Sequence, residues 1–108
     1  MVSHTIKPTE KLYIKKDMLI TQANLFSKKS YGIHQLTKLS IFTSDQGPFL
    51  DDVAMVMFFE GDIIVLPSEH KCYKMIYDEL SKVVSFDYEA VIKAMSSTEN
   101  AEFILWRK

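Results

Sequence analysis

The feature that most constrains the fold is a seven-residue apolar run, Val53 to Phe59, near the middle of the chain. An apolar run of this length without polar alternation is typical of a β-strand that is covered on both faces. Glu60-Gly61-Asp62 follows it as a tight turn, and Ile63 to Leu66 has the length of a returning strand. We therefore predict an antiparallel hairpin centred on Gly61, with its first strand in the middle of a sheet.

The residues before this hairpin alternate between apolar and polar side chains, as strands with one covered face do. The pattern from residue 12 to residue 26 predicts either a half-buried strand or a hairpin that reverses at Lys15-Lys16-Asp17, and a turn is expected after it at Lys28-Lys29-Ser30. A short strand is expected around residues 31–34, and the apolar residues from Leu36 onward lead into a β-branched stretch that ends at Thr43. Residues 1–10 are expected to form a polar lead-in.

After Pro67 the apolar period changes to the one typical of amphipathic helices. Ser68 is the expected N-cap of a first helix, whose buried stripe is predicted to be Cys72, Met75, Ile76, Leu80 and Val83. Asp87 is the expected N-cap of a second helix, and Phe86 and Val91 have the spacing of a hydrophobic staple around it. The alternation of residues 101–107 predicts one last strand.

Strands that precede helices predict an α+β protein rather than one in which the two alternate. We expect a curved antiparallel sheet of about six or seven strands, covered by the two helices of the C-terminal half and closed by the final strand. A pleckstrin-homology domain is the nearest analogy, although the strand after the helices departs from it. Of the 108 residues, 47% are hydrophobic and 25% charged, so residues 11–108 are expected to form a single domain around one core.

The composition favours a protein of the cytoplasm. The single cysteine, Cys72, excludes an internal disulfide, and residues 1–10 lack the apolar segment of a signal peptide. The longest apolar run is far shorter than the about 20 residues that a membrane-spanning helix needs. No membrane span is therefore expected.

The net charge of −1 hides an uneven distribution. Residues 1–40 carry seven lysines and two acidic residues, a net charge of +5, whereas residues 41–108 carry a net charge of −6. The asymmetry can mark a basic binding face, or it can place a basic sheet edge opposite acidic helices. Because the lysines are scattered and protect sheet edges, a nucleic-acid partner is not expected.

The segment between residues 44 and 52 contains the first candidate contact groups. Ser44 to Pro48 is rich in turn-forming residues, and it is followed by an aromatic residue and paired acids. The candidate binding residues are Asp45, Phe49, Asp51 and Asp52, together with Trp106 near the end of the chain. The carboxylates could hold a cation or could serve a local turn, and Phe49 could project as a contact or fold inward as a plug.

No catalytic or metal site is assigned from the sequence. His4, His34, His70 and Cys72 lack the spacing of a zinc site, because residues two apart on a helix do not face the same way. Cys72 is more simply explained as a small residue of the core. No cofactor is expected either.

Two stretches resemble a family of short uncharacterised bacterial proteins. The first is Asp45-Gln46-Gly47-Pro48-Phe49-Leu50-Asp51-Asp52-Val53, which is similar to that family's G-P-F-x-x-D-V segment. The second runs from Phe86 to Met95 and continues through Ser97 to Phe103 and Trp106-Arg107. The resemblance covers roughly residues 40–107. It implies a bacterial, cytoplasmic protein, and it brings no activity with it.

Two functions of different classes remain open. The first is a non-catalytic protein-binding or regulatory module, which the lack of any nucleophile–base or metal spacing favours. The second is a small-ligand-binding domain or minor enzyme that uses the Asp45–Asp52 loop together with Trp106. The sequence favours the first, identifies no partner and gives no oligomeric state.

Overall fold

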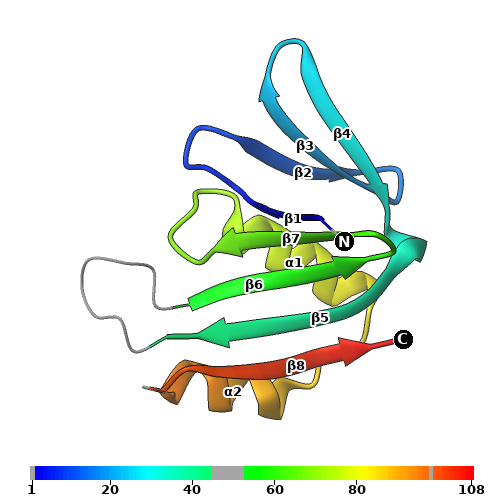
Figure 1. Ribbon diagram of the computed structural model, residues 1–108. Helices are drawn as coiled ribbons and strands as arrows, with labels where there is room; N and C mark the ends of the chain where they lie inside the picture. The colour runs from blue at the N-terminus through cyan, green and yellow to red at the C-terminus, as the bar shows by residue number, and fades with distance from the viewer. Residues whose placement is uncertain (1, 45–52, 98) are drawn as a thin grey trace.

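The computed structural model describes residues 2–44, 53–97 and 99–108, and it is an α+β fold with two sheets and two helices (Figure 1). A five-stranded sheet has the order β1-β7-β6-β5-β8, and a three-stranded sheet has the order β2-β3-β4. The strands are β1 (Val2–Thr5), β2 (Lys11–Lys15), β3 (Met18–Asn24), β4 (Ser27–Gly32), β5 (Leu36–Thr43), β6 (Val53–Phe59), β7 (Asp62–Pro67) and β8 (Ala101–Arg107). The helices are α1 (Tyr73–Val83) and α2 (Tyr88–Ser96), and a single 3-10 turn, Ile33–Gln35, joins β4 to β5.

The central hairpin predicted from the apolar run is confirmed as β6 and β7. The two strands pair antiparallel, with Phe58 opposite Ile63 and Met55 opposite Leu66. Gly61 has a φ of +89°, a conformation that side chains with a Cβ rarely adopt, and this explains a glycine at the turn. The strand β6 lies in the middle of its sheet, and its inward residues Met55 and Met57 are fully buried.

The expected reversal at Lys15-Lys16-Asp17 is also confirmed. Lys16 and Asp17 both have positive φ, the conformation that a two-residue turn needs to match the twist of its strands. The predicted turn at Lys28-Lys29-Ser30 is wrong, because these residues lie within β4. The chain instead reverses at Leu25 and Phe26, where the Asn24 side chain accepts a hydrogen bond of 2.8 Å from the Phe26 N–H.

The sheet differs from the expected one in three ways. The described residues form eight strands rather than six or seven, these make two open sheets rather than one sheet closed by the final strand, and one pair is parallel. Part of the expected polar lead-in is β1, which pairs parallel with β7, with Val2 opposite Asp62. The polar sequence of β1 is explained by its position at an edge, which has only one neighbouring strand. The pleckstrin-homology analogy is not confirmed.

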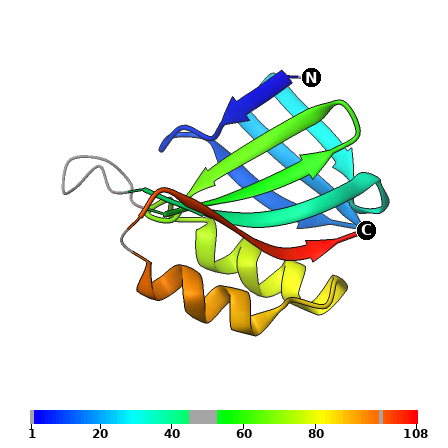
Figure 2. The same cartoon turned by 60° about the horizontal axis from the view of Figure 1, so that its bottom comes forward.

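Both helices lie on one side of the five-stranded sheet (Figure 2). The helix α1 begins at Tyr73, so the N-cap predicted at Ser68 is wrong. Residues 68–72 form turns instead, in which the His70 ring accepts a hydrogen bond from the Cys72 N–H. The N-cap predicted at Asp87 is confirmed, since its carboxylate accepts the Ala90 N–H at 3.2 Å.

A single core fills the space between the two sheets and the helices. The largest of its fully buried side chains are Ile6, Leu12, Leu19, Leu36, Leu39, Ile41, Met55, Met57, Ile64, Leu66, Ile76 and Leu80. Only Ile76 and Leu80 of the predicted α1 stripe are buried, whereas Met75 and Val83 are exposed. The predicted apolar stripe is therefore wider than the face that α1 turns towards the core.

Candidate functional site

The residues proposed from the sequence do not assemble into one described site. Asp45, Phe49, Asp51 and Asp52 lie outside the residues that the structure describes. The described residues that flank them, Thr43 and Val53, pair with each other at one end of the five-stranded sheet. Trp106 pairs with Leu39, towards the other end of β5. The sheet register therefore separates Trp106 from the Thr43 and Val53 end of the sheet.

Trp106 itself is half-buried beside a cavity of about 480 Å³. The other lining residues are Asp17, Ile33, His34, Leu36, Val83, Val84 and Lys108. The Lys108 ammonium donates a hydrogen bond of 3.1 Å to the His34 carbonyl at this place. The cavity is largely apolar, and Trp106 packs against the core here.

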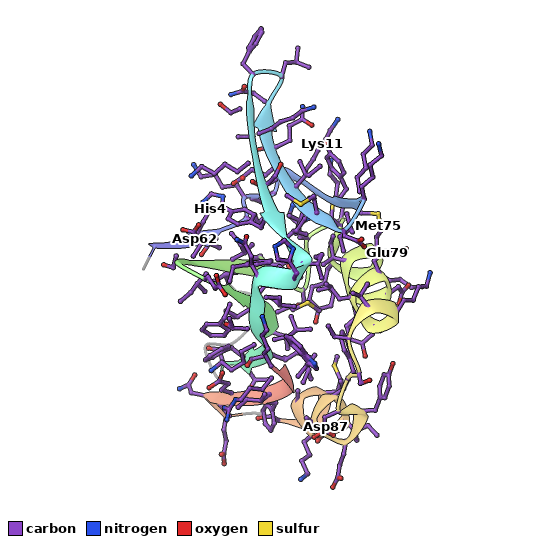
Figure 3. All side chains as sticks on the ribbon, turned by 90° about the vertical axis from the view of Figure 1, so that its right-hand side faces the viewer. His4, Lys11, Asp62, Met75, Glu79 and Asp87 are labelled. Carbon is purple, nitrogen blue, oxygen red and sulfur yellow. The ribbon has the colours of Figure 1, made fainter. Side chains whose placement is uncertain are left out.

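A more polar cleft of about 460 Å³ lies between the two sheets, on the side of β1 and β4. It is lined by Ser3, His4, Glu10, Thr21, Ala23, Phe26, Ser27, Lys28, Lys29, Tyr31, Asp62, Ile63 and Ile64. Figure 3 shows His4 and Asp62 on the opposite side of the molecule from Met75 and Glu79 of α1. The cleft has a size that is common for small-molecule sites.

A hydrogen-bonded pair, His4 and Glu10, forms part of the wall of this cleft. Glu10 is only 5% exposed, and one of its carboxylate oxygens lies 2.9 Å from His4 Nε2. The other oxygen accepts the Lys7 N–H at 3.0 Å, which closes a short turn between β1 and β2. Burial by itself raises the pKa of the Glu10 carboxyl, but the hydrogen bonds from His4 and the Lys7 N–H outweigh it, so the net pKa is lowered. The carboxylate therefore stays ionised and holds the His4 ring in place.

The other titratable groups of the cleft are of both signs. Burial and the nearby Asp62 carboxylate both raise the pKa of the Tyr31 hydroxyl, which keeps it protonated as a hydrogen-bond donor. Lys28 and Lys29 are exposed at the hairpin side of the cleft. Over residues 2–44, 53–97 and 99–108, no group of three or more His, Cys, Asp or Glu side chains could hold a metal ion. The arrangement can bind a polar ligand through hydroxyl, imidazole and ammonium groups.

A second surface of interest is the outer face of α2. Tyr88, Ile92 and Met95 are 56%, 69% and 63% exposed, and their i, i+4, i+7 spacing places them along one stripe. Beside the stripe is an apolar groove of about 270 Å³ between α1 and α2, to which Met95, Tyr73 and Tyr77 contribute. The opposite face of α2 packs on the sheet, with Ala94 buried.

Charged residues of α2 line the same exposed surface. The Lys93 ammonium lies 3.6 Å from the Glu89 carboxylate, four residues earlier on the helix. Both side chains are largely exposed, so the pair contributes little to stability. The surface thus combines an apolar stripe with a rim of both charges, as protein-contact surfaces often do.

Most of these residues are not among the candidates that the sequence indicates. His4 and Glu10 lie in the segment that the sequence predicts to be a polar lead-in, and nothing in its pattern indicates that the two side chains meet. The exposure of Ile92 and Met95 on the second helix is not predicted from the sequence either. A signal was present in α2, because Val91, Ala94 and Ala90 already supply an inward face and leave the other apolar residues without a place in the core.

The comparisons with known proteins found no relative of this chain. No family model, no curated protein and no solved structure matches it. Among the described residues, neither helix is long and apolar enough to cross a membrane.

Proposed function

We propose that this chain is a non-catalytic protein-binding module whose contact surface is the outer face of α2. The observation that carries the proposal is the stripe of Tyr88, Ile92 and Met95, which stays more than half exposed on a helix already packed by its other face. Contiguous apolar surface of this kind is typical of protein contacts. The resemblance to short bacterial proteins makes a bacterial cytoplasm the proposed setting.

The chemistry of the surface defines the partner that it suits. The groove beside Met95 is apolar and open, and the tyrosines at its edge combine a large apolar ring with a hydroxyl. An amphipathic helix or another apolar segment can place its side chains in such a groove. Glu89 and Lys93 then set the orientation of the partner through their charges.

Substitutions on α2 test this proposal directly. The tagged wild-type chain should enrich a partner reproducibly from a bacterial lysate, and the double variant Ile92→Ser/Met95→Ser should lose it. The matched control is Glu89→Gln/Lys93→Gln, which changes the same helix surface without removing apolar area. Equal enrichment by the wild type and the apolar variant, or no enrichment by either at physiological salt, would refute the proposal.

The cleft between the sheets supports a second candidate function, the binding of a small polar ligand. The supporting observation is the convergence of His4, Tyr31 and Lys29 on one cavity, with Glu10 fixing the imidazole. A ligand at 100 times its dissociation constant stabilises the folded state by about 2.7 kcal/mol. A thermal-shift screen of metabolites should therefore find compounds that stabilise the wild type but not the Lys28→Gln/Lys29→Gln variant. A flat screen would exclude this candidate.

A further inference from the structure

We propose that the tip of the β3–β4 hairpin docks onto the surface of an anionic phospholipid bilayer. Its two apolar tip residues would enter the interfacial region, and its lysines would contact the lipid phosphates. This site is separate from the protein-contact surface on α2. The hairpin and α2 lie at opposite ends of the molecule (Figures 1 and 3).

The tip presents two large apolar side chains to solvent. Leu25 is 82% exposed and Phe26 is 96% exposed, the highest values among the exposed large hydrophobic residues of the described chain. All residues from 23 to 30 are exposed, so the end of the hairpin projects beyond the body of the domain. Neither side chain contributes to the core.

The conformation of the turn does not explain these residues either. Two-residue hairpin turns usually contain Gly, Asn or Asp, because these residues tolerate positive φ. In the described chain only Lys16, Asp17 and Gly61 have positive φ, so Leu25 and Phe26 do not. The Asn24 carboxamide, which accepts the Phe26 N–H, holds the turn with its own side chain. Polar residues would therefore fit the two tip positions equally well, and neither folding nor packing accounts for the apolar pair.

Lysines surround the apolar tip on both faces of the hairpin. Gln22 of β3 pairs with both Lys11 and Lys28, so these two lysines lie in one row on the same face. Lys29 belongs to the next row, opposite Thr21, and points to the other face. At about 3.3 Å per residue, Lys28 and Lys29 lie roughly 7–10 Å along the strand from Phe26. This distance matches the depth to which apolar groups enter the interfacial zone of a bilayer, about 5–10 Å.

The distribution of charge along the chain also favours an approach of the hairpin to an anionic surface. Residues 11–32, which form the three-stranded sheet, carry five lysines against Asp17, a net charge of +4. Residues 33–108 carry a net charge of −5. The field of an anionic membrane therefore turns the hairpin towards the surface and the acidic remainder away from it.

The acidic residues that share the cleft with Lys28 and Lys29 do not form ion pairs with these two lysines. Asp62 and Glu10 line the same cleft as Lys28 and Lys29. The Glu10 carboxylate is already bound by His4 and the Lys7 N–H. The ion pairs found among the described residues involve His4, Lys38, Lys82 and Lys93, so the lysines of the hairpin are outside them. Each lysine close to an anionic surface strengthens binding about fivefold.

Vesicle binding tests the proposal with the full chain. Wild-type protein should sediment with vesicles of phosphatidylcholine mixed with phosphatidylglycerol, and it should stay in the supernatant with pure phosphatidylcholine. The tip variant Leu25→Ser/Phe26→Ser should weaken partitioning at least about tenfold through the loss of apolar burial. The charge variant Lys28→Gln/Lys29→Gln should weaken it about 30-fold, and added salt should weaken wild-type binding.

A matched control and a spectroscopic readout separate the alternatives. Ile92→Ser/Met95→Ser removes two exposed apolar side chains from α2 and should bind the vesicles as the wild type does. In the variant Phe26→Trp/Trp106→Phe the only tryptophan lies at the tip, and its emission should shift to the blue on anionic vesicles. Wild-type protein that ignores anionic vesicles, a tip variant that binds equally well, or an unshifted tip tryptophan would overturn the proposal.

Discussion

The His70 side chain joins the β1–β2 connection to the start of α1, and its removal is expected to destabilise the fold strongly. The ring is 9% exposed. Nδ1 accepts the Cys72 N–H at 3.0 Å, so the proton must be on Nε2, which faces the Lys7 carbonyl at 3.1 Å and the Glu10 carbonyl at 3.0 Å. One imidazole thus satisfies three main-chain groups from two distant parts of the chain.

The magnitude follows from what His70→Ala leaves behind. The Cys72 N–H and two carbonyls lose their partner in a largely buried place, and an unsatisfied buried group costs about 1–3 kcal/mol. Because water can reach part of this region, we expect a loss of about 2–4 kcal/mol in the free energy of unfolding. For a domain of this size that corresponds to a decrease in Tm of at least about 10 °C.

Equilibrium unfolding in urea measures this loss, and two further variants divide it. His70→Asn should keep the acceptor for the Cys72 N–H, whereas His70→Gln should keep a donor for the two carbonyls, so each should cost less than His70→Ala. His34→Ala is the control, since His34 is exposed. A loss below about 1 kcal/mol for His70→Ala, or equal losses for all four variants, would show that the three hydrogen bonds do not stabilise the fold as argued.

Three further outcomes are expected. The pKa of the Glu10 carboxyl is lowered from its ordinary value of 4.5, so its ionised form stabilises the fold above pH 4.5. This stabilisation is lost as the pH falls through the lowered pKa. The free energy of unfolding of Glu10→Gln, measured in urea, should therefore depend less steeply on acid pH than that of the wild type. Gly61→Ala should lower the free energy of unfolding by about 1–2 kcal/mol, because φ is +89° at this position. The added Cβ would meet no atom within 4 Å, so the loss comes from the backbone conformation alone. An unchanged Tm in thermal unfolding would contradict this. Met55→Asp should prevent folding or cost several kcal/mol, because the side chain is fully buried in the central strand, while the exposed Ile92→Asp should change the circular dichroism and Tm little.

The sequence predicted best where a local rule decides the structure. The run from Val53 to Phe59 is too apolar to lie anywhere but in the sheet centre, and Gly61 can adopt the conformation that its turn needs. Asp87 could be recognised as an N-cap because its carboxylate reaches only three residues along the chain. In these places the energy that fixes the structure comes from neighbouring residues.

The predictions were wrong mainly where contacts between distant parts of the chain determine the local structure. Nothing in residues 2–5 indicates that they pair with β7, because the partner strand begins about sixty residues later. Ser68 was predicted as the N-cap of α1 because its hydroxyl is locally available, whereas residues 68–72 form turns in which the His70 ring is held by the carbonyls of residues 7 and 10. The turn at Leu25 and Phe26 was missed because both residues look like strand residues. Whether Phe49 is buried stays a prediction, since it lies outside the described residues.

The pairing of strands from opposite ends of the chain governs how the sheet can form during synthesis. The three-stranded sheet closes through two-residue turns, so it can fold as soon as its residues are available. By contrast, β1 can pair only after β7 has been synthesised, and β5 can pair with β8 only after residues 101–107 have been synthesised. At about 5–20 residues per second the apolar strand β5 keeps an open edge for several seconds. The β5 edge is therefore the place where a nascent chain is most exposed to wrong pairing with another copy, and where a chaperone would have the most to protect.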